Sequence, residues 1–265
     1  MKITFSSIQM NCQFEKMETN FQTGVNFINQ LPVDEKHLVL LPELWTSGFS
    51  DTKDAVSDSN HQIIDSLKSI AKSRNMIIAG SYIIKEENDY YNQLIIINED
   101  GKKIAKYNKN HLFPQMREKT LFSPGNSLSI LKVWDVKISM AVCYDLRFPE
   151  LFRNYAIFKT EICLLPAQWP SKRLEHFKIL LSARAIENQM IFLTTNPCGK
   201  ISNTAFAGHS SLIDHKGKIH FELNDNESII TKRIDISELY RYRSGFPVLN
   251  DAHLIQDKDI TFYEF

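Results

Sequence analysis

The sequence predicts a mixed α/β fold, and three kinds of pattern support this prediction. Short apolar segments with the two-residue alternation of strands recur along the 265 residues, beginning with residues 3–9, where Ile3 and Phe5 share one face. Apolar residues at helical spacing follow some strands, as in residues 17–28. Hairpin turns such as residues 98–101 join other strands. Strands joined in both ways predict mixed sheets with helices outside them.

The first half of the chain contains a strand that we expect to be buried on both faces, at residues 37–41. This apolar run stops at Pro42 and Glu43, and a loop with two large aromatic residues follows. The other elements expected here are a helix over residues 63–71 and strands over residues 76–84, 90–97 and 102–107. Residues 115–126 lack clear periodicity, which predicts an ordered loop, and long ordered loops tend to be functional.

The second half continues the alternation of strands and helices. A strand begins at Lys137 and ends at Cys143. The other expected elements are helices over residues 150–158 and 174–189, strands over 162–165, 191–195 and 229–236, and a hairpin over 211–214 and 218–221. Residues 243–265 lack periodicity but are rich in apolar residues, so we expect this tail to pack on its own body or on a second subunit. Because no linker or repeat is visible, residues 1–265 are expected to form one domain.

Composition narrows the class of protein. Lys+Arg and Asp+Glu both count 31, and this balance argues against nucleic acid as a partner. No apolar run is long enough to span a bilayer, and the first residues lead directly into a strand, so neither a membrane anchor nor a signal peptide is expected. The four cysteines are widely spread and include no C-x-x-C pair, which argues against a zinc ribbon and favours a reduced, cytoplasmic setting.

Cys143 lies where a strand is expected to turn into a helix. The segment after it changes character at once, and Pro149 suits the first turn of a helix better than a strand. At such a corner a side chain faces a pocket, and nearby backbone N–H groups stay unpaired, as an oxyanion site needs. Two interpretations remain open from this stretch alone: Cys143 is a nucleophile, or it is a small buried apolar residue at a strand end.

Two further charged residues lie at the ends of expected strands. Glu43 follows the buried strand, where a carboxylate costs free energy unless it is paired, so it is either salt-bridged or a catalytic base. Lys109 follows the strand over residues 102–107, where most lysines are simply solvated. In α/β folds, functional sites gather beyond the carboxyl ends of strands.

The segments around Glu43, Lys109 and Cys143 together resemble the three signature blocks of the nitrilase superfamily of carbon–nitrogen hydrolases. The resemblance covers almost the whole chain and includes residues 123–126 and 183–188. It implies a four-layer α-β-β-α sandwich, usually paired into dimers, and a Glu–Lys–Cys triad at these three positions. It also implies that Glu118 matches a second, assisting glutamate. No metal or organic cofactor is implied.

The chemistry of these groups is consistent with that triad. Only a few per cent of a free thiol is ionised at neutral pH, so Glu43 is expected to take the Cys143 proton during attack. Lys109 and the backbone N–H of Tyr144 would stabilise the oxyanion, and water activated by Glu43 would hydrolyse the thioester. Glu118 would orient Lys109 or the substrate amide. His111 is the competing candidate for the base, although a structural role suits it better.

The loops around Glu43 and Cys143 look most like the ω-amidase branch, whose members hydrolyse the terminal amide of 2-oxoglutaramate or 2-oxosuccinamate. Such small-molecule substrates carry a carboxylate, which Arg147 could bind with its planar fork, and Trp169 could form a pocket wall. The alternative for Arg147 is a salt-bridged scaffold role. Other branches cleave nitriles, N-carbamoyl amines or larger amides.

Two rival functions belong to other classes. An acyltransferase would pass the same thioester to an amine, but such relatives are membrane-linked and this chain contains no span. A non-catalytic binding module would retain the fold without the triad, whereas all three triad residues are present. The apolar tail, together with the dimeric state that the family resemblance implies, predicts a homodimer.

Overall fold

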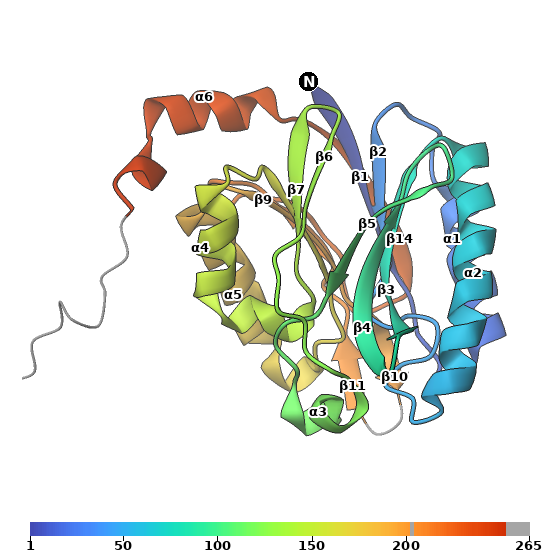
Figure 1. The fold of residues 1–265 in the computed structure, drawn as a ribbon. Helices are drawn as coiled ribbons and strands as arrows, with labels where there is room; N and C mark the ends of the chain where they lie inside the picture. The colour runs from blue at the N-terminus through green and yellow to red at the C-terminus, as the bar shows by residue number, and fades with distance from the viewer. Residues whose placement is uncertain (202–203, 253–265) are drawn as a thin grey trace, which may run out of the picture.

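Two six-stranded sheets lie face to face and helices cover their outer faces (Figure 1). This computed structural model describes residues 1–201 and 204–252. The first sheet contains, in spatial order, β14 (Ser228–Asp235), β1 (Lys2–Gln9), β2 (His37–Leu40), β3 (Ile77–Glu86), β4 (Asp89–Ile97) and β5 (Lys103–Asn108). The second sheet contains β13 (Ile219–Glu222), β12 (Ser211–Ile213), β9 (Ile191–Thr195), β8 (Ile162–Pro166), β7 (Val136–Met140) and β6 (Ile130–Val133).

Each sheet is mixed, as the sequence predicts. Strands β1, β2 and β3 are parallel neighbours, and so are β7, β8 and β9. The outer strands of both sheets pair antiparallel, largely through hairpins. A separate two-stranded sheet is formed by β10 (Cys198–Ile201) and β11 (Thr204–Ala207).

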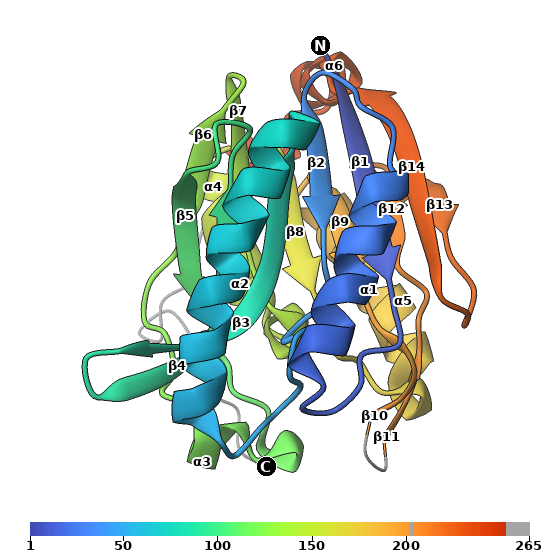
Figure 2. The ribbon, with the colours of Figure 1, turned by 90° about the vertical axis from the view of Figure 1, so that its right-hand side faces the viewer.

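The helices complete four layers. Helices α1 (Met17–Gln30) and α2 (Lys53–Arg74) cover the first sheet, and α4 (Pro149–Ile157) and α5 (Leu174–Glu187) cover the second (Figures 1 and 2). Helix α6 (Ser237–Gly245) lies at one end of the sandwich and the short α3 (Glu118–Leu121) at the other (Figure 1). The described residues also contain four 3₁₀ segments: η1 (Pro114–Met116), η2 (Cys143–Arg147), η3 (Ser171–Arg173) and η4 (Val248–Asn250).

Side-chain alternation explains why the sheets stack. In β2, Leu38 and Leu40 join the apolar core between the sheets, whereas Val39 and the following Leu41 join the core under the helices. Because side chains on a strand alternate between faces, a fully apolar strand must be covered on both sides. The α-β-β-α sandwich satisfies this requirement for the central strands of both sheets, and the prediction of this fold class is confirmed.

Several elements differ from the sequence-based expectation. Helix α2 begins at Lys53, ten residues before the expected start, because its first turns bury a single apolar side chain, Val56, beside the polar Ser57 and Asn60. Ser57 accepts a hydrogen bond from the backbone of Lys85, and Asn60 donates one to the carbonyl of Ile83. The expected loop over residues 115–126 contains part of η1 and all of α3, which are too short to show periodicity.

The region after residue 236 contains a helix that the sequence patterns do not predict. Helix α6 buries only Leu239 among its nine residues, so it shows little apolar periodicity. Arg243, where the expected tail begins, donates hydrogen bonds to the backbone carbonyls of Gln189 and Thr160 on its own body. Residues 253–265 of the expected tail lie outside the described residues. No helix within residues 1–201 and 204–252 is both long and apolar enough to cross a membrane.

Candidate active site

Glu43, Lys109 and Glu118 form one buried charged cluster beside Cys143. Glu43 lies shortly after β2, Lys109 directly after β5, and Cys143 opens η2 after β7. The Lys109 Nζ atom donates to Glu43 Oε1 at 2.8 Å and to both carboxylate oxygens of Glu118 at 2.8 Å. At most 1% of the Lys109, Glu43 and Glu118 side chains is exposed, so water scarcely screens these charges.

Two amides tie the cluster together. Asn92 on β4 donates through Nδ2 to Glu43 Oε1 at 2.7 Å and to Glu118 Oε1 at 3.1 Å. The backbone N–H of Gln168 donates to Glu43 Oε2 at 2.7 Å, and the Gln168 side chain donates to the Glu43 carbonyl at 2.7 Å. These donors fix both oxygens of the Glu43 carboxylate, and the Gln168 contacts join the first sheet's loop to the second sheet's loop.

The turn at Cys143 has a strained backbone. Cys143 has φ +46°, in the left-handed region that residues other than glycine and asparagine seldom occupy. Asp145 holds the turn, because its Oδ2 accepts from the Val142 N–H at 2.9 Å and from the Tyr107 hydroxyl at 2.8 Å. Cys143 and Tyr144 occupy the first positions of η2, where backbone N–H groups have no intrahelical acceptor.

His111 is engaged with this turn rather than with the thiol. Its backbone N–H donates to Asp145 Oδ1 at 3.0 Å, and its ring Nδ1 lies 2.7 Å from the same oxygen. The ring also stacks on Phe148, with centroids 3.7 Å apart. These contacts give His111 a structural position on the Cys143 turn and support the expectation that it is not the base.

Burial and the neighbouring charges shift the pKa values of Lys109, Glu118 and Cys143. Burial opposes the ammonium of Lys109, but Glu118 and Glu43 outweigh it and raise the pKa of Lys109 above its usual value. Burial also raises the pKa of Glu118, against the attraction of Lys109. The pKa of the Cys143 thiol is raised well above its usual value, mainly by burial and next by the Glu43 carboxylate. Lys109 opposes this rise. The resting nucleophile candidate is therefore a neutral thiol beside a fixed carboxylate.

A small cavity of about 10 Å³ lies over Cys143, with room for about one water molecule. Both residues that the sequence suggested for the substrate pocket line it: Arg147 and Trp169. The Arg147 guanidinium lies 4.7 Å from the centroid of the Trp169 ring, and its Nη2 is 3.4 Å from His176 Nδ1.

Comparison with known proteins agrees with this geometry. A family model described as carbon-nitrogen hydrolase matches residues 4–244. This chain belongs to the carbon–nitrogen hydrolase family. A solved structure of the CN-hydrolase superfamily protein XC1258 from Xanthomonas campestris, with an arsenic adduct in its active site, is 28% identical, with a TM-score of 0.89. The likeness covers 97% of this chain and 99% of that chain. The predictions of family and of a hydrolase acting on C–N bonds are confirmed.

Two curated relatives of this carbon–nitrogen hydrolase carry more specific names. The 2-oxoglutaramate amidase of Bacillus subtilis (strain 168) is 36% identical over 95% of this chain and 98% of its own length. The ω-amidase YafV of Escherichia coli (strain K12) is 32% identical over 82% of this chain and 84% of its own length.

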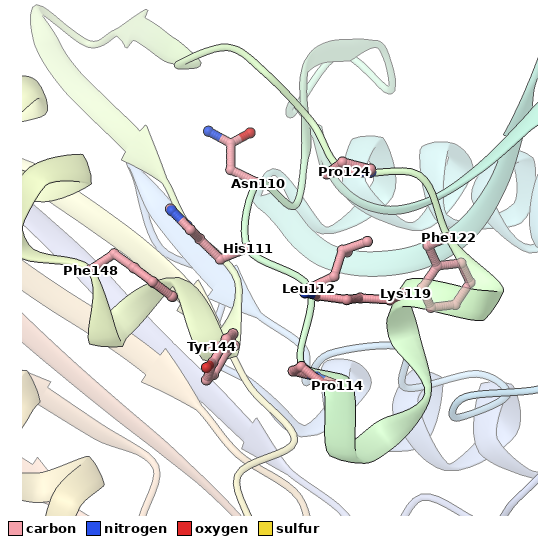
Figure 3. A pocket seen from close by; sticks show the side chains of 9 residues that line it. All are labelled: Asn110, His111, Leu112, Pro114, Lys119, Phe122, Pro124, Tyr144 and Phe148. Atoms are coloured by element: carbon pink, nitrogen blue, oxygen red, sulfur yellow. The ribbon is translucent and has the colours of Figure 1, made fainter.

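A larger cavity of about 520 Å³ adjoins the thiol cavity of this hydrolase (Figure 3). One side is lined by His111, Tyr144 and Phe148, and the other includes Phe122 and Pro124. Tyr144 lines both this cavity and the one over Cys143, so its ring forms part of the wall between them. The larger space is mostly apolar and does not include the charged cluster.

Four residues at this site were not predicted from the sequence. Asn92 and Gln168 bind the Glu43 carboxylate, Asp145 holds the Cys143 turn, and Arg173 lines the thiol cavity. Two of these residues could have been identified from the sequence. Asn92 is a buried polar residue in a largely apolar strand, and Gln168 follows a strand end at Pro166. Asp145 and Arg173 reach the site through turns, which periodicity does not report.

Proposed function

We propose that this carbon–nitrogen hydrolase is an ω-amidase that converts 2-oxoglutaramate or 2-oxosuccinamate to the dicarboxylate and ammonia. The observation that carries the proposal is the buried cluster of Glu43, Lys109 and Glu118 beside a neutral Cys143 thiol. Its relatives from Bacillus subtilis and Escherichia coli, named 2-oxoglutaramate amidase and ω-amidase, support the choice of substrate.

The first half of the proposed reaction forms a thioester. The Cys143 sulfur attacks the amide carbon while Glu43 accepts the thiol proton. Lys109 and the backbone N–H of Tyr144 stabilise the negative charge that develops on the amide oxygen. Glu43 then gives its proton to the amide nitrogen, the C–N bond breaks, and ammonia leaves. Glu118 keeps the Lys109 ammonium in place through two contacts of 2.8 Å.

The second half hydrolyses the thioester. Water enters the space that ammonia vacates, and Glu43 takes one of its protons as the oxygen attacks the acyl carbon. The same donors hold the second oxyanion. When the C–S bond breaks, the proton on Glu43 returns to the Cys143 sulfur, and the new carboxylic acid is released and gives its remaining proton to solvent, which yields the dicarboxylate. No step requires a metal or an organic cofactor.

Arg147 and Trp169 are the substrate-binding residues of the proposal. Arg147 has no carboxylate partner within residues 1–201 and 204–252, and its guanidinium faces the cavity that contains the thiol. A planar guanidinium binds a carboxylate through two parallel hydrogen bonds, which suits a 2-oxo acid. Trp169 backs the guanidinium and forms the wall beside it.

The test is ammonia release from 2-oxoglutaramate, glutamine, a simple nitrile and an N-carbamoyl amino acid, with Cys143→Ala as the blank. We expect fast release from the 2-oxo amide alone, and none with the variant. Turnover of another substrate instead would retain the carbon–nitrogen hydrolase and overturn the ω-amidase assignment. Undiminished turnover by Cys143→Ala would overturn the thiol mechanism.

We also propose a single-domain, cytoplasmic homodimer. Several large apolar side chains are exposed on α4, α5, β13 and the segment after α6: Ile157, Phe158, Ile179, Ile186, Ile219 and Phe246. Large apolar side chains exposed on these elements could be buried by a second copy of the chain. Light scattering at micromolar concentration should give twice the chain mass of 30.7 kDa. Ile179→Lys should shift the mass toward the monomer, and a wild-type monomer would contradict the proposal.

A further inference from the structure

A second guanidinium faces the cavity over Cys143. Arg173, at the end of η3, lines this cavity together with Arg147, Phe113 and Trp169. Its guanidinium carbon lies 5.5 Å from the centroid of the Phe113 ring, as that of Arg147 lies over Trp169. Each cation is thus backed by an aromatic face, an arrangement that orients a guanidinium without neutralising its charge.

Neither cation has an anionic partner in the part of the chain that the structure describes. Neither Arg147 nor Arg173 has a carboxylate oxygen within 4 Å among residues 1–201 and 204–252, although both line the same cavity. Two unneutralised guanidiniums at one small cavity repel each other, and an anion between them would relieve this repulsion.

Arg173 is held toward the cavity by neutral contacts. Its Nη2 donates to the Gln115 side-chain oxygen, and its own carbonyl accepts from Trp169 Nε1 at 2.8 Å. Gln115 belongs to η1, directly before the helix that carries Glu118. A guanidinium has five N–H donors, so the bond to Gln115 leaves others available to a ligand.

We propose that Arg173 is a specificity-determining residue that binds the carboxylate end of the substrate jointly with Arg147. This inference rests on the proposed function, because a 2-oxo acid amide presents two carboxylate oxygens and an adjacent 2-oxo oxygen. One guanidinium fork serves two of these three acceptors, and the second fork serves the third. Gln115 acts as a positioning residue for Arg173. The pair of cations therefore selects 2-oxo acid amides over neutral amides of equal length.

The experiment compares 2-oxoglutaramate with pentanamide, which has the same number of carbons but no carboxylate, in Arg173→Met and Arg173→Lys. We expect Arg173→Met to raise KM for 2-oxoglutaramate about tenfold or more, the loss of one charged hydrogen-bonding partner. The kcat/KM for pentanamide should stay within about twofold. Arg173→Lys, which keeps the charge but loses the fork, should fall between wild type and Arg173→Met.

Lys172→Met is the matched control, because it removes a neighbouring positive charge that does not line the thiol cavity. Lys172→Met should leave the kinetic constants for both 2-oxoglutaramate and pentanamide unchanged. Binding of 2-oxoglutarate to Cys143→Ala, measured by calorimetry, gives a second readout without turnover, and adding Arg173→Met should weaken it about tenfold.

The outcomes separate this inference from the proposed function. If wild type hydrolyses 2-oxoglutaramate but Arg173→Met leaves its KM and 2-oxoglutarate binding unchanged, the role of Arg173 is wrong and the ω-amidase assignment remains. Equal losses for both amides would make Arg173 structural and would also overturn the inference. If wild type hydrolyses only other amides, the proposed function fails, and the Arg173 inference fails with it.

Discussion

Lys109 places one positive charge between two buried carboxylates, so its removal should affect both stability and catalysis. Lys109→Met should lower kcat at least about 100-fold, through loss of oxyanion stabilisation. It should also lower the free energy of unfolding by about 3–5 kcal/mol near pH 8, because the Glu43 and Glu118 charges lose their partner. Urea unfolding and steady-state kinetics measure the two effects.

The pH dependence of the Lys109→Met variant has a definite sign. The pKa of Glu118 is already raised by burial, and Lys109 is the group that opposes this. A carboxyl with a raised pKa favours the folded state below its unfolded pKa, and this stability is lost as pH rises through the folded pKa. The deficit of the variant should therefore be smaller at pH 5 than at pH 8, and Glu118→Gln in the same chain should restore part of it. A deficit independent of pH would contradict this account.

Cys143 should react with iodoacetamide before the other three cysteines. All four thiols have raised pKa values from burial, so ionisation at rest does not distinguish them. Cys143 differs because it faces a cavity and has Glu43 beside it to accept a proton during attack. Mass spectrometry after brief native labelling should find the adduct at Cys143, and Glu43→Gln should slow its formation. Equal labelling at all four positions would argue against an activated thiol.

At the scale of elements, the segment after β5 has to pass very close to the segment around Gly125. A Cβ atom on Gly125 would lie 2.1 Å from the carbonyl oxygen of Asn108, and the Gly125 N–H donates to the carbonyl of Lys109 at 2.9 Å. Gly125→Ala must push this backbone apart, so we expect a loss of about 1–3 kcal/mol in stability and a lower kcat. Gly245→Ala is the control and should leave kcat unchanged, because beyond its own helix turn the new methyl meets no atom of residues 1–201 and 204–252 within 4 Å. If Gly125→Ala and Gly245→Ala showed the same stability and kcat, the close approach of Gly125 to Asn108 would have no role in either property.

Sequence patterns predicted the elements whose burial is apolar. The strand after Leu38 and the helix around Leu67 carry continuous or periodic apolar residues, and both were found near their expected positions. Elements stabilised by polar contacts were missed or shortened: the first turns of α2 depend on Ser57 and Asn60, and α6 buries only Leu239. Hydrogen bonds between distant segments leave no period in the sequence, so local patterns could not reveal them.

At the scale of the whole molecule, the charged cluster belongs to neither sheet alone. Glu43, Lys109 and Asn92 come from the first sheet, whereas Cys143 and Gln168 follow strands of the second. The sequence placed Glu43, Lys109 and Cys143 at strand ends, and the family resemblance grouped them. Their contacts depend on how the two sheets stack, and stacking also supplies the Gln168 bonds to Glu43. The site is therefore a property of the sandwich.

The same burial that keeps Cys143 neutral makes the whole protein sensitive to alkali. Burial raises the pKa of Cys198 to about 12 and those of Cys12, Cys143 and Cys163 above their usual range. The unfolded chain loses these protons near pH 9 while the folded protein retains them. Stability is therefore complete below pH 9 and falls as pH rises, at up to about 1.4 kcal/mol per pH unit for each thiol.

Cys163→Ala tests this linkage in reduced protein. Urea unfolding between pH 9 and 10 should show a slope against pH that is smaller than that of wild type by about 1 kcal/mol per pH unit, because one titrating thiol is absent. Val136→Ala is the control, since it also trims a fully buried side chain but removes no proton. It should lower stability equally at every pH in this window. If the slope of Cys163→Ala matched that of wild type, the Cys163 thiol would have to ionise equally in both states, and burial would not be holding its proton.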